Sequence, residues 1–409
     1  MNRSAARSQV WALAALVPAT VWVVIWLLGP DGTDFDFGVS IRFSRDLGII
    51  WRASALIGPV LALVFTIRGL GQSVSREQHP VTAEWVAIGA GSAVLLALVM
   101  GTDLPARGGA RADEDVVAGS AAPARGPDLS TGTHVLLLGT GTPNAEPSAS
   151  GPATAVIVDG HAYIVDAGPG VVRRASAAAE RYRTDALALR NLDIVFLTHL
   201  HSDHTVGLPD LIHTPWVQER EAPLRVFGPA GTENMAEHIT AAWSADIENR
   251  LSGRQFATPD GWRVVARDVA PGVVYEDERV RVTAFPVSHT GWSQALGYRF
   301  DTADRSIVIS GDTTPTDIIV AMCNGCDVLL HEVYSASAFA NRPAIWQSYH
   351  AQAHTSTSEL GALAVRARPG LLILHHQLMW GASPGSALEE IRQAGYEGDL
   401  AYGRDLEVY

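Results

Sequence analysis

The last two thirds of this chain predict a layered α/β domain, and three observations support that fold class. Short apolar segments recur from Thr133 onward, and glycine turns separate several of them, as between β-strands. Segments of helical length lie between some of these strands, which is the pattern of a layered α/β fold. Polar clusters with histidine or aspartate follow many of the strands. Strands that end at one edge of a sheet aim such residues at a common point.

Composition limits the class of partner. The chain has 409 residues, which is enough for one large or two modest domains. Its net charge is −13, and all 30 of its basic residues are arginine. An acidic chain without basic clusters is poorly suited to holding a nucleic-acid backbone. We therefore expect no nucleic-acid partner.

The two cysteines, Cys323 and Cys326, are too few for a disulfide scaffold. Their C-x-x-C spacing suits a redox pair or half of a zinc site. No second C-x-x-C exists to complete such a site. We therefore favour two small residues near a helix end.

Residues 1–102 differ from the rest of the chain, because they contain apolar runs at 10–28, 53–67 and 86–100. About 20 apolar residues cross a bilayer as a helix, and the second and third runs reach this length only with flanking residues. Tryptophans near the runs favour two or three transmembrane helices over a buried helical hairpin. A cleaved signal peptide fits less well, because the first run is long and no A-x-A site follows it. We predict a multi-pass membrane protein that contacts lipid. The flanking arginines are too balanced to orient it.

The α/β domain is expected at 133–409, after a flexible linker at 103–132 that is rich in glycine, alanine and proline. Strands at 134–141 and 154–168 come first, and a helix follows them at 170–183. Later strands are expected at 192–199, 223–229, 279–290, 295–300, 306–313, 327–334 and 370–376. Later helices are expected at 355–368 and 386–395.

The strand at 192–199 leads into FLTHLHSDHTVGL, where His199, His201, Asp203 and His204 occupy six positions. Each of these side chains is costly to bury without a partner. Imidazole and carboxylate together suit zinc or another borderline divalent metal. The spacing cannot form one helical face. On a tight loop, however, the first two histidines can reach one metal while Asp203 and His204 reach a second.

The run T-H-L-H-S-D-H resembles the signature of the metallo-β-lactamase superfamily, and the resemblance covers residues 133–409. The fold of that family is an αββα sandwich with one or two metals at the sheet edge. The resemblance implies two divalent metal ions, with zinc expected and manganese or iron as alternatives. The implied ligands are His199, His201 and His289 for one metal, Asp203, His204 and His376 for the other, and Asp312 between them.

Two further positions follow from the same resemblance. Asp166, in the segment IVDAGPG, resembles an aspartate that supports the metal loop without binding metal. In the segment PGLLILHHQ the pattern of the family places the ligand second, so we expect His376 to bind. The adjacent His375 remains the alternative.

The expected chemistry is hydrolysis, because two divalent metals lower the pKa of a shared water toward neutrality. Asp203 can orient that water or accept its proton. His354, in AHTSTSELG, resembles a histidine of ribonuclease Z and is the expected general acid. His331, in LLHEVY, resembles part of another segment of that enzyme and is a second candidate. The alternative for His331 is a strand-end histidine bonded to a backbone carbonyl.

The expected substrate is a small or medium phosphodiester or sulfate ester, cleaved by a membrane-anchored enzyme. A bridging aspartate favours such esters, as in the arylsulfatase-like and cyclic-phosphodiesterase-like branches. Bacterial ribonuclease Z carries an RNA-binding arm for which the chain between His289 and Asp312 leaves no room. The alternatives are a ribonuclease Z-type endoribonuclease without the arm, a non-catalytic metal-bound membrane sensor, and a di-iron redox protein. No oligomeric state is predicted.

Overall fold

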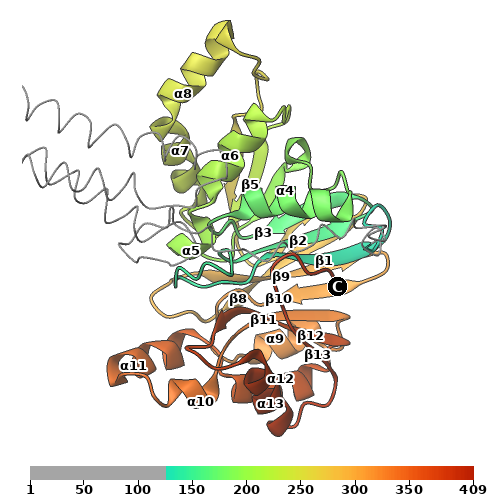
Figure 1. Cartoon of the computed structure of the whole chain (residues 1–409), viewed down its shortest axis with the longest axis vertical. Helices are drawn as coiled ribbons and strands as arrows, with labels where there is room; N and C mark the ends of the chain where they lie inside the picture. Colours follow the sequence, from blue (N-terminus) through green and yellow to red (C-terminus); the bar gives the residue numbers. More distant parts are fainter. Residues whose placement is uncertain (1–125) are drawn as a thin grey trace, which may run out of the picture. The chain divides into compact units, whose positions relative to one another are not determined.

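Two mixed β-sheets pack face to face in residues 126–409, the part of the chain that this computed structural model describes (Figure 1). The first sheet has the strand order β1 to β6: β1 (Thr133–Gly139), β2 (Ala153–Val158), β3 (His161–Val165), β4 (Ile194–Phe196), β5 (Leu224–Gly228) and β6 (Val264–Asp268). The second has the order β13 to β7: β13 (Asp399–Tyr402), β12 (Leu371–Leu378), β11 (Val328–Tyr334), β10 (Ser306–Ile309), β9 (Ala295–Thr302), β8 (Val280–Val287) and β7 (Gly272–Glu276).

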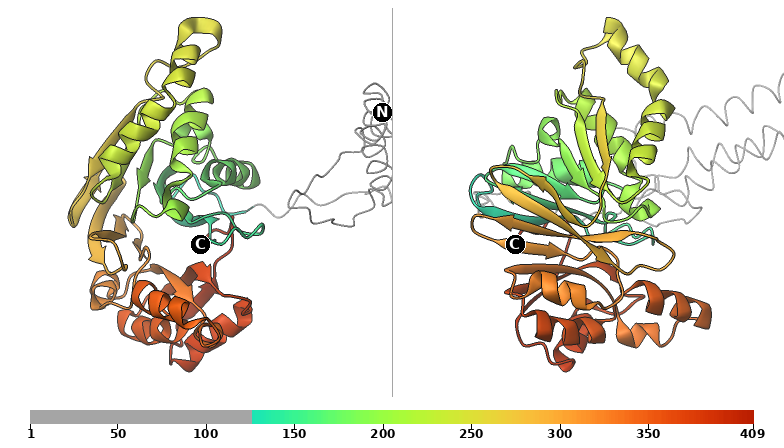
Figure 2. Two further views of the ribbon diagram at one scale, coloured as in Figure 1. Left: turned by 90° about the vertical axis from the view of Figure 1, so that its left-hand side faces the viewer. Right: turned by 180° about the vertical axis from the view of Figure 1, so that it is seen from behind.

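Helices cover the outer face of each sheet, as the two views of Figure 2 show. The first sheet is covered by α4 (Val171–Tyr182), α6 (Leu208–Val217) and α7 (Thr232–Ala242). The second is covered by α9 (Asp317–Cys323), α12 (Thr357–Ala367) and α13 (Pro384–Gln393). The remaining helices are α5 (Ser202–Thr205), α8 (Ser244–Asn249), α10 (Ala336–Phe339) and α11 (Ala344–Ala353). The expected αββα sandwich is therefore confirmed.

Three strands were not predicted, and all three lie at sheet edges: β6, β7 and β13. Their residues are mostly exposed or half-buried, so they lack the apolar run that marks a central strand. The central strands are buried on both faces. Phe196 stacks on Phe227 and contacts Tyr298 and Phe300 between the two sheets, which fixes how the sheets pack.

The membrane prediction must be corrected. Within the described residues, no helix has the length and apolar character needed to cross a bilayer. The apolar runs that led to the prediction lie in residues 1–102, outside the described part of the chain. The multi-pass localisation and the lipid contacts are therefore withdrawn. The boundaries 1–102, 103–132 and 133–409 stay predictions.

Cys323 and Cys326 form a disulfide at the end of α9, which the sequence analysis did not favour. Both sulfurs are buried among apolar side chains of the second sheet and its helices. The position near a helix end is as expected. The disulfide joins residues only three positions apart in the sequence.

Candidate metal centre

The predicted ligands converge because several strands end at the same edge of the two sheets. The loop after β4 carries the cluster at 199–204, β8 leads to His289, β10 leads to Asp312, and β12 carries His376. All of these side chains except that of His201 are almost fully buried. Buried imidazoles and carboxylates at this density need partners, and several lack a hydrogen bond, including His204 Nε2 and Asp312 Oδ1.

The first group of candidate ligands is His199, His201 and His289. His201 Nδ1 lies 2.9 Å from His199 Nε2 and 3.1 Å from His289 Nε2. Burial lowers the pKa of all three imidazoles, which keeps them neutral, the form that binds metal. The ring of His289 is held by a hydrogen bond from Nδ1 to the carbonyl of Ala353 at 2.8 Å, which turns Nε2 toward the group.

The second group is Asp203, His204 and His376, with Asp312 beside it. His376 Nε2 lies 3.3 Å from Asp203 Oδ2 and 3.4 Å from Asp312 Oδ2. Asp312 Oδ2 also lies 3.5 Å from His204 Nε2 and 3.9 Å from His199 Nε2. Asp312 therefore faces both groups. Burial opposes its charge, but the imidazoles of His376 and His204 hold the pKa of Asp312 well below its usual range.

A β-bulge separates the two adjacent histidines of β12. His375 pairs with Glu332 of β11 and Gln377 pairs with Val333, so His376 is the extra residue. Its φ of 45° is unusual for a side chain other than glycine. A bulge of this kind changes the direction of one side chain. Here it makes the side chain of His376 point toward the candidate metal centre. His375 is buried with neither ring nitrogen hydrogen-bonded, so the geometry favours His376 as the ligand.

The carboxylate of Asp166 contacts Thr198 and His204 of the candidate metal loop. One oxygen accepts a hydrogen bond from the backbone N–H of Thr198 at 2.8 Å. The other lies 2.9 Å from His204 Nδ1, which leaves His204 Nε2 facing Asp312. Thr198 also places its hydroxyl 3.0 Å from His199 Nδ1. Thr198 thus orients a ligand, a role that the sequence analysis missed although it immediately precedes the first histidine.

Two glycines that the sequence analysis passed over let the loops approach each other. A Cβ on Gly168 would lie 2.6 Å from the carbonyl oxygen of Asp203. A Cβ on Gly207 would lie 2.3 Å from the carbonyl oxygen of Gly168. Both contacts are with backbone, which cannot move aside easily. Glycine is therefore required at both positions.

His354 lies at the end of α11, beside the second group. Its Nδ1 is 3.4 Å from Glu332 Oε2 and 3.9 Å from Asp312 Oδ2, and its ring stacks on His376 with centroids 5.6 Å apart. Burial lowers the pKa of His354 to about 4 and raises the pKa of Glu332 well above its usual range. Glu332 is anchored by the backbone N–H of Thr355 at 2.8 Å. The carboxyl of Glu332 therefore holds a proton more readily than the imidazole of His354 does.

His331 lies elsewhere. Its ring is fully buried and its Nδ1 bonds the backbone carbonyl of Glu332 at 2.7 Å, as in the alternative described above.

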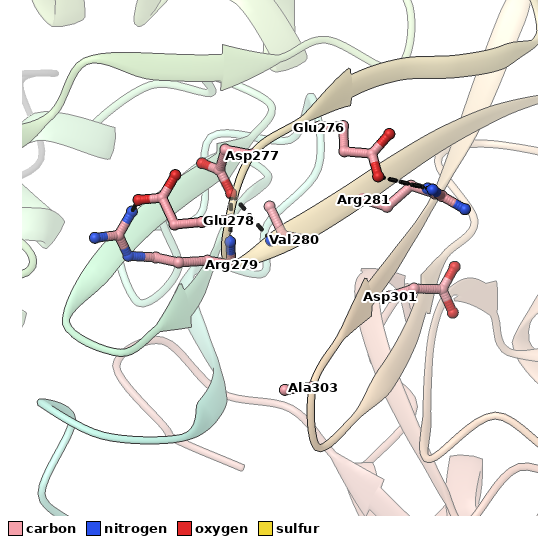
Figure 3. A pocket seen from close by; sticks show the side chains of 8 residues that line it. All are labelled: Glu276, Asp277, Glu278, Arg279, Val280, Arg281, Asp301 and Ala303. Carbon is pink, nitrogen blue, oxygen red and sulfur yellow. Dashed lines mark hydrogen bonds and ion pairs between the residues drawn. The ribbon is translucent and has the colours of Figure 1, made fainter.

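The open surface pocket of Figure 3 is also separate from the metal centre. It surrounds the turn between β7 and β8, where Arg281 pairs with Glu276 at 2.7 Å and Arg279 pairs with Glu278. These charges satisfy one another and leave no binding group free.

Comparison with known proteins places this fold and site. The family model for the β-lactamase superfamily domain matches residues 161–377 of this chain. A ribonuclease Z from Mycobacterium sp. (strain KMS) is 34% identical over 247 residues, which are 60% of this chain and 84% of that relative. Human tRNase Z, short form, aligns with a TM-score of 0.50 at 20% identity over 68% of this chain and 98% of that one. The metallo-β-lactamase fold protein YhfI of Bacillus subtilis gives 0.51 at 16% over the same shares. These two structures show a common fold.

The αββα sandwich and its ligand groups define a metal-dependent hydrolase. The chain belongs to the metallo-β-lactamase superfamily. Proteins of this fold usually bind divalent metals, and the two groups of ligands fit that chemistry.

The expectation of no nucleic-acid partner is wrong. Relatives that match most of the described domain carry the name ribonuclease Z. The expectation rested on a net charge of −13 summed over the whole chain. A sum over the chain does not describe the potential at one site, where bound cations are the largest local charges.

Proposed function

We propose that this chain is a metal-dependent endoribonuclease of the ribonuclease Z type, acting on RNA with an unpaired 3′ extension. The observation that carries the proposal is the Glu332–His354 pair beside Asp312, with His354 Nδ1 3.4 Å and 3.9 Å from the two carboxylates. Hydrolysis of an RNA phosphodiester releases a ribose hydroxyl, which needs a proton. The names of the relatives support this substrate class.

We assign the ligands as the groups stand in the structure. His199, His201 and His289 would hold one ion, Asp203, His204 and His376 the other, and Asp312 would contact both. When bound, two divalent ions supply an activated water and positive charge for the phosphate oxygens. Zinc suits this mixture of imidazole and carboxylate, and manganese or iron are alternatives.

Two residues would carry out the two proton transfers of the reaction. Asp203 accepts hydrogen bonding from the attacking water and can take its proton. His354 faces Glu332 through Nδ1, which leaves Nε2 for the leaving oxygen. The phosphorus–oxygen bond to the leaving ribose breaks, and that oxygen takes the proton. We assign no catalytic role to His331, since its ring is buried and bonded to a backbone carbonyl.

The test uses the purified full chain with added Zn²⁺ or Mn²⁺. We expect cleavage of a transfer-RNA transcript with a 3′ extension, and hydrolysis of bis(p-nitrophenyl) phosphate. We expect no hydrolysis of p-nitrophenyl sulfate. Hydrolysis of the small diester with no RNA cleavage would contradict the endoribonuclease. Metal binding without turnover of any substrate would instead favour a sensor.

A further inference from the structure

A row of aromatic rings leads from the surface to the metal centre. Trp346, His350 and His354 are spaced four residues apart along α11 and its end, so they share one face. The rings of Trp346 and His350 stack at 5.8 Å, and those of His350 and His354 lie 5.5 Å apart. His354 in turn stacks on the proposed ligand His376. We call these three side chains the aromatic row.

The outer end of the aromatic row is open. Trp346 is 48% exposed, whereas His350 and His354 are buried. The neighbouring Ile345 is 76% exposed. Figure 1 shows α11 projecting from the second sheet on the same side as α5, which carries the metal loop. The aromatic row therefore continues the proposed active site outward.

The segment that carries the aromatic row contains one cation and no acidic residue, although Asp312 and Glu332 lie beside its inner end at His354. From Val333 to Ser358 the sequence contains no acidic residue, although the chain as a whole carries −13. Arg342 lies over the ring of Trp380 at 5.1 Å, and Trp380 contacts His350 at 4.8 Å. The Nε of Arg342 is buried without a hydrogen-bond partner, and the residue as a whole is half-buried. This surface thus combines π-faces with a cation, as single-stranded nucleic-acid sites do.

We propose that Trp346 is a stacking platform for an unpaired nucleobase near the scissile phosphodiester. The proposal rests on the proposed function and adds an RNA-binding surface to it. Bases splayed from single-stranded RNA stack on aromatic side chains without regard to sequence. The projection formed by α7 and α8 is a poorer candidate, since it carries acidic residues such as Glu237 and Glu248.

The experiment measures binding of a fluorescein-labelled, phosphorothioate-linked oligoadenylate to the full chain loaded with Zn²⁺, followed by fluorescence anisotropy. Trp346→Ala should weaken binding about 5-fold to 150-fold, the range for loss of one base stack. Trp346→Phe should restore most of the affinity because it keeps a π-face. Trp243→Ala is the matched control, since Trp243 is 40% exposed between α7 and α8. It should bind like the unaltered chain.

A second probe separates stacking from general damage. An abasic version of the same oligonucleotide should bind the unaltered chain and Trp346→Ala equally well. If Trp346→Ala binds the adenylate normally, or weakens both probes alike, the platform is wrong. If instead it converts a dimer to a monomer in sedimentation, the surface covers a second copy of the chain and the platform is also wrong.

Failure here is distinguishable from failure of the proposed function. RNA cleavage with unchanged binding by Trp346→Ala overturns only the platform. Binding that depends on Trp346 without RNA cleavage overturns only the endoribonuclease. No binding of either probe by the unaltered chain contradicts both.

Discussion

At the scale of single residues, the group that faces each buried imidazole decides what that histidine can do. His354 is buried beside two carboxylates, with Nδ1 facing Glu332, while His331 faces a backbone carbonyl. His376 faces Asp203 and Asp312, whereas both nitrogens of His375 lack partners. Residue type alone does not separate these roles. The direction of the ring and the group opposite it do.

His354→Ala should retain both metals and slow hydrolysis of esters with poor leaving groups by about 10² to 10⁴. The loss should shrink for p-nitrophenolate, which leaves with little need of a proton. Rates with both classes of leaving group and metal content per chain are the measurements. His201→Ala is the control and should lose metal and all activity. Equal slowing of both classes would remove the acid role from His354.

We expect His376→Ala to change the metal content of the protein and His375→Ala to change its stability. The first removes a proposed ligand, so we expect loss of about one ion per chain and of activity. The second removes a buried ring that faces no ligand, so metal content should persist while the melting temperature falls, because a cavity remains. Metal analysis and thermal unfolding check both. Metal loss on changing His375 alone would reverse the assignment.

At the scale of elements, the site depends on how closely loops approach. The bulge in β12 orients one histidine. The close packing of Gly168 and Gly207 holds α5 and the turn after it against the loop that follows β3. A bulge arises from a mismatch between β11 and β12, so its position depends on a partner strand that is distant in sequence.

Gly207→Ala should destabilise the fold and weaken metal binding. The added Cβ would lie 2.3 Å from the carbonyl oxygen of Gly168, so the backbone must shift. Overpacking of this kind costs about 1 to 3 kcal/mol. Gly385→Ala, whose Cβ would meet nothing closer than Ser383 Oγ at 3.8 Å, is the control. Thermal unfolding compares the two, and similar melting temperatures would refute the argument.

At the scale of the whole molecule, the described residues supply both sheets, all four layers and every proposed ligand. Leu129 is buried in the core of the first sheet, four residues before β1 begins at Thr133. Leu129 therefore packs with the domain, although it lies in the segment predicted as a linker.

A fragment of residues 126–409 should fold without the preceding chain and bind about two divalent ions. A fragment of residues 133–409 should melt at a lower temperature, because it lacks Leu129 and its apolar burial. Circular dichroism and metal analysis are the measurements. An insoluble longer fragment, or equal melting of the two, would show that the boundary lies elsewhere.

The sequence by itself determined a layered α/β domain through its local apolar runs. It determined the superfamily, the αββα arrangement and the candidate ligands near His199 only through the resemblance of the contiguous motif T-H-L-H-S-D-H. It did not predict the edge strands β6, β7 and β13, whose exposed residues lack such runs. Whole-chain charge misled the choice of partner. Only the tertiary structure showed the bulge that points His376 rather than His375 toward the other candidate ligands, placed Glu332 beside His354, and lined up the aromatic row with the candidate metal centre. The physical reason is that these contacts join side chains from different elements, so strand register and loop packing set them rather than spacing along the chain.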